Sequence, residues 1–176
     1  MALNASPKNI AIAFAVGIAL AVGGIYLYES SGTDPIAASE ASAAQTAGGE
    51  LPSVTVYKSP TCGCCTEWVD HLEQKGFPVK TTDMQDVQSM KNRLGVPRTL
   101  SACHTAVVDG YVVEGHVPAS DIKRLLQKQP DVTGLSVPGM PVGSPGMERG
   151  DRVDPYRVMS FTASGRTNVF NMYSGR

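Results

Sequence analysis

Three of the four cysteines in this chain, Cys62, Cys64 and Cys65, lie within four positions. A β-prone run at residues 54–57 precedes them, and the apolar residues Trp68, Val69 and Leu72 follow them at the spacing of one helix face. This order predicts a strand, a tight loop and the first turn of a helix. A helix N-terminus has unpaired N–H groups and a partial positive charge, which stabilise a thiolate. The sequence therefore places reactive thiols where they are easily deprotonated.

The cluster has two chemical uses, disulfide exchange and metal binding. Adjacent Cys64 and Cys65 rarely bridge each other because the ring is strained. A Cys-x-x-Cys redox pair needs only Cys62 and Cys65, which are therefore the redox candidates. The thiol of Cys64 adds little to disulfide exchange but is a further soft ligand, so the ligand chemistry favours metal binding. Thiolate-rich sites suit Cu(I), and four sulfurs in a tetrahedron also suit Zn(II).

Residues 10–28 form an uninterrupted uncharged run. At about 1.5 Å per residue the run is just long enough for a hydrocarbon core of about 30 Å. Lys8 precedes it and Glu29 follows, which sends the C-terminal part outward. We expect an uncleaved single-span anchor after a short segment at residues 1–9; a cleaved signal, with an A-x-A site at residues 41–43, is the alternative. Both export the rest of the chain, and exported thiols are driven to disulfides unless a metal holds them.

The formal charge of −1 shows no basic excess, so nothing argues for nucleic acid as a partner. Residues 29–50 are small and polar and are expected to be a flexible linker. A folded metal-binding domain is expected at residues 51–130, and a Pro/Gly/Met-rich extension packed on it at residues 131–176.

Patterns of strand and helix alternate from residue 51 onward. Asp109-Gly110 is a strong hairpin signal, and Ser120 is expected to cap the third helix. The first crossover requires a parallel pair and the hairpin adds an antiparallel one, so we predict an α/β fold with a four-stranded mixed sheet. The predicted strands are residues 53–58, 78–83, 102–108 and 111–114, and the predicted helices are residues 64–75, 86–94 and 121–128.

The C-terminal extension has a different pattern. Residues 134–147 are rich in glycine and proline, and we expect neither helix nor central strand there. Residues 156–162 and 167–173 flank a short polar segment and predict a terminal hairpin.

Five motifs of the chain form a recognisable set: Tyr57-Lys58-Ser59-Pro60-Thr61-Cys62-Gly63-Cys64-Cys65, Gly95-Val96-Pro97, Ser101-Ala102-Cys103-His104-Thr105-Ala106, residues 110–118 (GYVVEGHVP) and residues 137–147 (VPGMPVGSPGM). Taken together, these motifs resemble the bacterial periplasmic copper-resistance family of the CopG type, over residues 53–173. The resemblance implies a thioredoxin-like fold, Cu(I) bound by the Cys-x-Cys-Cys thiols and the later cysteine, and redox chemistry at that site. The anchor is not part of the family pattern.

In a thioredoxin-like fold the chain returns beside the Cys-x-x-Cys loop near Cys103. We expect this fourth thiol to be a ligand or a disulfide partner rather than a core residue. His104 follows directly, and neighbouring strand side chains point to opposite faces, so a structural role is an equal alternative for it. His116, in the loop before the third helix, is the better candidate for a ligand or proton carrier. His71 is expected to be exposed.

Met140 and Met147 are weaker ligand candidates. A thioether is soft and does not titrate, so it suits Cu(I), and the alternative role is hydrophobic gap-filling.

The favoured function is that of an exported copper(I)-binding protein, contributing to copper tolerance by sequestration, by redox chemistry at the thiolates, or by both. Expected partners are copper ions, periplasmic redox or copper-handling proteins, and the inner membrane through the N-terminal span, with the domain on its periplasmic side or free in the periplasm if the span is cleaved. Whether the protein is an enzyme, a copper or thiol oxidoreductase, stays open. The alternatives are a periplasmic thiol–disulfide oxidoreductase and a non-enzymatic zinc or disulfide module.

Overall fold

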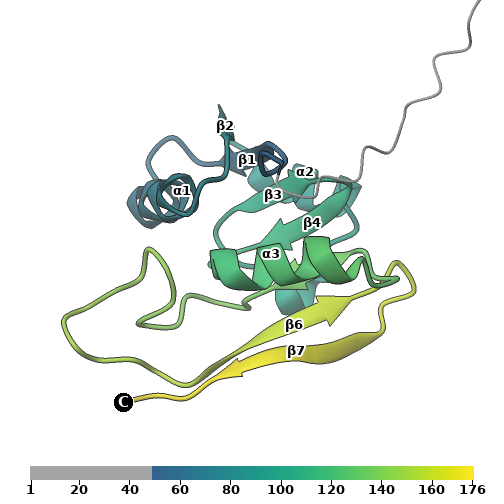
Figure 1. Ribbon diagram of the computed structural model, residues 1–176. Helices are drawn as coiled ribbons and strands as arrows, with labels where there is room; N and C mark the ends of the chain where they lie inside the picture. Colours follow the sequence, from purple (N-terminus) through teal and green to yellow (C-terminus); the bar gives the residue numbers. More distant parts are fainter. Residues whose placement is uncertain (1–48) are drawn as a thin grey trace, which may run out of the picture. The chain divides into compact units, whose positions relative to one another are not determined.

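The structure is a computed structural model, and it describes residues 49–176. These residues form one seven-stranded mixed sheet of order β2-β1-β3-β4-β5-β6-β7, with three α-helices (Figure 1). The α/β class is confirmed, and the sheet is larger than the four strands predicted because the extension adds three more. The elements are β1 (Val54–Lys58), α1 (Gly63–Gln74), β2 (Val79–Asp83), α2 (Val87–Arg93), η1 (Arg98–Leu100), β3 (Thr105–Val108), β4 (Tyr111–Glu114), α3 (Ala119–Lys128), β5 (Gly134–Ser136), β6 (Tyr156–Phe161) and β7 (Thr167–Tyr173).

The pairing of β1 decides which loops meet. β1 runs parallel to β2 on one side and antiparallel to β3 on the other. In the antiparallel register Tyr57, near the end of β1, is opposite Thr105, the first residue of β3. The loop that leaves β1 and the segment that enters β3 therefore lie at the same end of the sheet.

Helices α1 and α3 pack on one face of the sheet. Trp68 and Leu72 of α1 share a buried cluster with Ile122 and Leu125 of α3 and with alternate residues of the strands, such as Val113. The opposite face has a smaller cluster around Leu100, Val112 and Phe161. Because successive strand residues point to opposite faces, the neighbours Val112 and Val113 belong to different clusters.

Some predicted boundaries are wrong. β3 begins at Thr105, not at residue 102, so Cys103 and His104 precede the strand. α3 begins at Ala119 after Pro118, and no side chain caps it, so Ser120 is inside the helix. By contrast, Asp86 does cap α2, since its carboxylate accepts a hydrogen bond from the N–H of Ser89 at 3.0 Å.

The Gly/Pro-rich segment does contain a central strand, against the prediction. β5 lies between β4 and β6. A side chain at Gly134 would overlap the carbonyl oxygen of Val112, so glycine is what allows β5 to pair this closely. The prolines follow only after β5 ends, beginning with Pro138. The predicted terminal hairpin is confirmed as β6 and β7.

No helix within residues 49–176 is long and apolar enough to cross a membrane. The predicted segments at residues 1–9 and 10–28, and nearly all of the predicted linker, lie outside the described residues.

A buried carboxylate fastens the C-terminal hairpin to α3. Asp121 is 2% exposed and accepts hydrogen bonds from the hydroxyl of Tyr173 at 2.7 Å and the side-chain amide of Asn171 at 3.1 Å. Arg124 forms an ion pair with the same carboxylate at 2.7 Å. The extension is therefore held by charge-assisted bonds as well as by the sheet.

We predict that Asp121→Ala lowers the free energy of unfolding by about 1.5–3 kcal/mol, because it removes the hydrogen bonds of a buried carboxylate to three half-buried partners. Urea unfolding measures this. The matched control is Asp154→Ala, which breaks the exposed pair with Arg152 and should lose only about 0–1 kcal/mol. Equal losses in the two variants would show that Asp121 is not a buried anchor.

Candidate functional site

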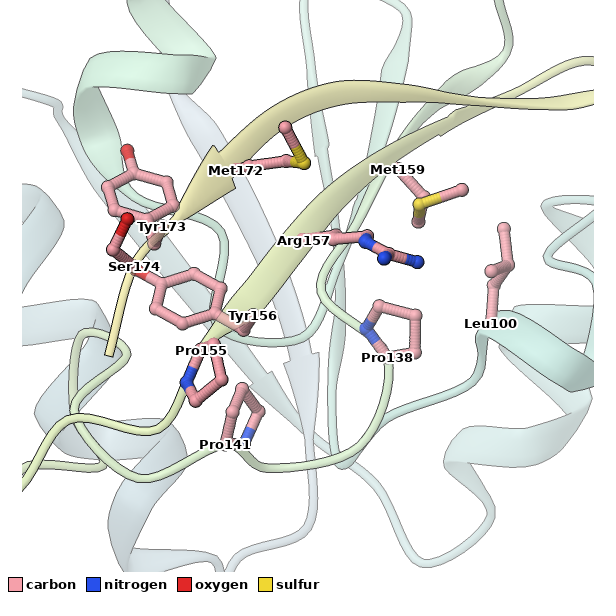
Figure 2. A pocket seen from close by; sticks show the side chains of 10 residues that line it. All are labelled: Leu100, Pro138, Pro141, Pro155, Tyr156, Arg157, Met159, Met172, Tyr173 and Ser174. Carbon is pink, nitrogen blue, oxygen red and sulfur yellow. The ribbon is translucent and has the colours of Figure 1, made fainter. Parts of the chain in front are cut away.

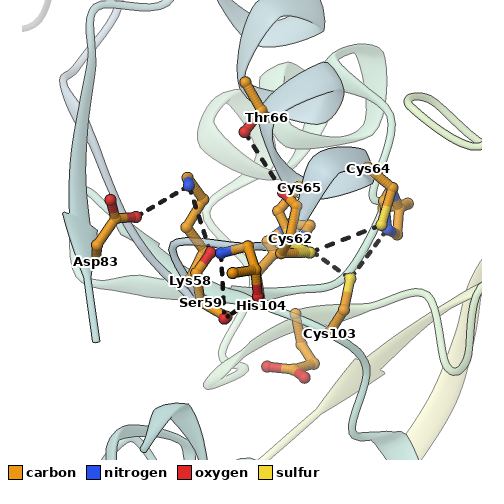
Figure 3. The surroundings of a disulfide bond; sticks show 12 residues. Lys58, Ser59, Cys62, Cys64, Cys65, Thr66, Asp83, Cys103 and His104 are labelled. Atoms are coloured by element: carbon orange, nitrogen blue, oxygen red, sulfur yellow. Dashed lines mark hydrogen bonds and ion pairs between the residues drawn. A yellow bond between two sulfur atoms is a disulfide. The ribbon is translucent and has the colours of Figure 1, made fainter. Parts of the chain in front are cut away.

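Four cysteine sulfurs converge where α1 begins. The Sγ atoms of Cys62, Cys64, Cys65 and Cys103 all lie within 4.8 Å of one another. Cys62 is the N-cap of α1, Cys64 and Cys65 are in its first turn, and Cys103 stands on the bend before β3 (Figure 3). The antiparallel β1–β3 pairing thus gathers cysteines that are far apart in the sequence.

The structure shows the site in an oxidised form. Cys62 and Cys65 are joined by a disulfide, while Cys64 and Cys103 are free thiols. The Sγ of Cys64 is 3.7 Å from that of Cys62, so a free thiol adjoins the disulfide. Reduction by two electrons and two protons would provide four thiols, which are the soft ligands of a metal site.

His104 and His116 both contact Cys103. Its Sγ lies 3.3 Å from Nδ1 of His104 and 3.1 Å from Nε2 of His116. His104 would point away from Cys103 if both were in a strand, but β3 begins only after them, at Thr105. The side chains of these three residues form a second potential metal-binding group that shares Cys103 with the sulfur cluster.

The C-terminal extension orients His116. Nδ1 of His116 donates a hydrogen bond to the carbonyl oxygen of Pro145 at 2.8 Å, since a carbonyl can only accept. In the neutral ring, Nε2 then carries a lone pair directed at Cys103. Histidine ligands of metals commonly use their second nitrogen in this way, bound to a backbone carbonyl.

His104 is fully buried, and its Nε2 has no hydrogen-bond partner among the described residues. Its ring packs on the indole of Trp68, with centroids 4.4 Å apart, and edge-on to His116 at 5.1 Å. Burial lowers the pKa of His104 well below its usual value, and neighbouring His116 and Lys91 lower it further. Burial also lowers the pKa of His116. Both imidazoles are therefore neutral near pH 7 and available as nitrogen donors.

The thiol of Cys103 keeps its proton in the absence of a metal ion. Burial, followed by the neighbouring Cys64, raises the pKa of Cys103 to about 12. A metal ion that binds this sulfur must displace the proton, which couples binding to pH.

The loop after β5 covers the start of α1. At Gly146, φ is +79°, and a Cβ there would stand 2.7 Å from the nitrogen of Trp68 and 2.8 Å from the carbonyl oxygen of Cys64. Only glycine allows this approach, which brings the neighbouring Pro145 carbonyl to His116. Met147 follows and is half-buried, whereas Met140 is 55% exposed and is not brought into the buried cluster.

The prediction that His71 is exposed is wrong. It is half-buried, and its Nε2 accepts a hydrogen bond from the N–H of Ala119 at 3.2 Å, at the start of α3. Two further residues near the site were missed, Lys91 and Glu114, which form a buried ion pair. Their spacing in the sequence carries no signal of this contact.

A pocket of about 740 Å³ opens elsewhere, along β6 and β7. Figure 2 shows Arg157, Met159 and Met172 around it, with Tyr156 and Tyr173 nearby. No cysteine or histidine lines this pocket. The sulfur cluster is therefore a partly buried group of side chains at a helix start and does not belong to this pocket.

The fold and the site define a mixed α/β protein with a thiol-rich candidate metal centre. Comparisons with known proteins match the same part of the chain. A family described as "Protein of unknown function, DUF411" matches residues 100–147, which include Cys103, His104 and His116. The search of curated proteins found no match.

Two solved structures match most of the chain. "Copper resistance protein copG- Form 1" is 49% identical, with a TM-score of 0.68, and the match covers 72% of this chain and 100% of that one. "Copper resistance protein copG- Form 2" has the same identity and TM-score, over 70% of this chain and 99% of that one. The chain belongs to the CopG copper-resistance protein family.

We predict that Gly146→Ala lowers the free energy of unfolding by about 1–3 kcal/mol, through the positive φ and the forced displacement of the loop. Gly139→Ala is the matched control, because Gly139 has a similar φ of +72° and open space around its Cβ position. Urea unfolding should show the larger loss for Gly146→Ala. Equal losses would mean that the contact with α1 does not constrain the loop.

Proposed function

We propose that this protein is an exported copper(I)-binding protein that contributes to copper tolerance. The observation that carries the proposal is the convergence of four cysteine sulfurs within 4.8 Å, with a histidine pair at one of them. Sulfur-rich sites favour Cu(I), and imidazole is an acceptable additional ligand. The printed name of the related structures, a copper resistance protein, points to the same metal.

The arrangement of the elements from β1 to α3 supports a thioredoxin-like interpretation of residues 51–130. The cysteine loop follows a central strand and opens a helix, and the next strand is parallel to the first. Export is supported by the apolar run at residues 10–28, which would place the domain on the periplasmic side of the inner membrane, or free in the periplasm after cleavage.

Redox chemistry at the same cysteines is part of the proposal. Two thiolates, those of Cys62 and Cys65, would pass one electron each to two Cu(II) ions, giving two Cu(I) ions and the Cys62–Cys65 disulfide. A dithiol protein of the periplasm would restore the two thiols by disulfide exchange and become oxidised itself. The Cys62–Cys65 disulfide of the structure is the bond that the first step would form.

A second candidate function, thiol–disulfide exchange with proteins, is favoured by that same disulfide at the N-terminus of α1. It needs Cys62 and Cys65 but not Cys64 or Cys103. The two functions therefore differ in the roles of the other two thiols.

We predict that the reduced protein binds Cu(I) at least about a thousandfold more tightly than the Cys62→Ser, Cys64→Ser, Cys65→Ser triple variant, because three of the four soft ligands are removed. Anaerobic titration against a Cu(I) chelator of known affinity measures this, with Zn(II) titrated in parallel.

Equal affinity of the wild type and the triple variant would falsify the copper proposal. Cys64→Ser separates the two candidate functions: a copper site loses affinity in this variant, whereas a disulfide-exchange enzyme keeps its activity, with or without a copper chelator. Zinc bound at one equivalent and resistant to replacement by Cu(I) would favour the structural module instead.

We predict that the affinity for Cu(I) rises with pH. The proton on Cys103, whose pKa burial raises to about 12, is displaced when a copper ion binds its sulfur. Each displaced proton should increase the apparent binding constant about tenfold per pH unit between pH 6.5 and 8. The two histidines add little to this dependence, because burial lowers their pKa values and favours the neutral rings. A pH-independent affinity would contradict binding to this thiol.

A further inference from the structure

A buried ion pair lies next to the sulfur cluster without belonging to it. Lys91, on α2, and Glu114, the last residue of β4, form an ion pair whose side chains are only 4% and 0% exposed. Burying two charges costs several kcal/mol per ion, and apolar residues in their place are often as stable or more so. Stability alone therefore does not explain the pair.

The carboxylate of Glu114 has a second partner. Its Oε1 accepts hydrogen bonds both from Nζ of Lys91 and from the backbone N–H of Ala102, the latter at 2.6 Å. Ala102 directly precedes Cys103. The side chain of Glu114 thus fastens the chain where it enters the bend that carries the fourth sulfur.

The other side of the bend is fastened to the same strand end. The N–H of Gly115 donates to the carbonyl of His104 at 3.1 Å. Hydrogen bonds to the backbone on both sides of Cys103 therefore hold the bend. Of these two bonds, only the one at Ala102 has a side chain as its partner. The bend precedes β3 and receives no support from strand pairing.

The second oxygen of the Glu114 carboxylate has weaker partners than the first. It makes no hydrogen bond of ordinary length and angle within residues 49–176, but Thr105 stands close enough to help stabilise the charged carboxylate. A half-satisfied buried polar group is a poor stabiliser. Glu114 differs from the carboxylate of an isolated ion pair because it also accepts a hydrogen bond from the N–H of Ala102.

We propose that Glu114, held in place by Lys91, is a positioning residue that sets where the Cys103 sulfur stands relative to the other three sulfurs and to His116. Its oxygen atom acts as the acceptor for the N–H of Ala102, and Lys91 neutralises the charge that this acceptor brings into the core. The relevance to copper rests on the proposed function, whereas the positioning itself does not.

Two double variants separate the acceptor from the charge. Lys91→Met with Glu114→Gln removes both charges but keeps an oxygen acceptor for Ala102. Lys91→Met with Glu114→Leu has a similar volume and removes the acceptor as well. Urea unfolding of both gives their stabilities, and circular dichroism checks that both are folded.

The first readout is the alkylation rate of Cys103 by iodoacetamide, measured in a Cys64→Ser background with the Cys62–Cys65 disulfide intact. Cys103 is then the one free thiol, since the chain has four cysteines. We expect the Leu variant to react about tenfold faster than the Gln variant, because a displaced thiol is more exposed and more readily ionised. The Gln variant, as the conservative rescue, should stay within about twofold of the Cys64→Ser parent.

The second readout is anaerobic Cu(I) binding with all four cysteines reduced. The Leu variant should bind at least about tenfold more weakly than the Gln variant, because Cys103 no longer completes the sulfur set. A difference in alkylation without Cu(I) binding by any protein, wild type included, would keep the positioning role and overturn the proposed function. Equal alkylation rates and equal Cu(I) affinities of the two variants would overturn the positioning role alone.

Ala102→Pro provides an independent test if the Leu variant does not fold. It removes the N–H donor and leaves Lys91 and Glu114 unchanged. The preceding Ser101 is extended, with ψ of 141°, which is the conformation that a residue before proline prefers. Faster alkylation of Cys103 in this variant supports the positioning role, and an unchanged rate contradicts it.

Discussion

The antiparallel pairing of β1 with β3 is the interaction on which the site depends. It places the loop after β1 and the bend before β3 at one end of the sheet. The helix start supplies three sulfurs there, and the bend supplies the fourth. A slip in this register would move Cys103 along the sheet and separate it from the other thiols, so the pairing of two buried strands controls the chemistry.

The C-terminal extension completes the site from the other side. Its loop lies against α1 at Gly146, and the carbonyl of Pro145 fixes the tautomer and the direction of the His116 ring. The three strands of the extension, β5, β6 and β7, belong to the same sheet as the first four, and Asp121 fastens β7 to α3. The extension is thus a structural part of the site, and removing it would free the His116 ring.

The site contains two kinds of titratable group, imidazoles and thiols, and burial favours the uncharged form of both. Burial keeps both histidines neutral and keeps the Cys103 thiol protonated. A soft metal ion that bound such a site would have to displace protons from sulfur but would find neutral nitrogen donors already in place. The Lys91–Glu114 ion pair next to the Cys103 bend is buried as well. Its carboxylate accepts a hydrogen bond from the N–H of Ala102 and so positions the backbone of the bend.

The sequence by itself determined the α/β class, the strand–cysteine–helix unit, the hairpins and the cluster of three thiols at the helix start. These follow from local patterns: apolar periodicity, turn residues and the spacing of cysteines. Only the tertiary structure decided the central place of β5, the contact of both histidines with Cys103, and the role of Glu114. The close approach of Gly134 to Val112, the contact of His116 with Cys103 and the bond of Glu114 to the N–H of Ala102 join residues that are far apart in the chain. His104 contacts its neighbour Cys103 because β3 begins only two residues after that cysteine. Local patterns carry no information on such contacts, because they arise only when the sheet and the helices have packed.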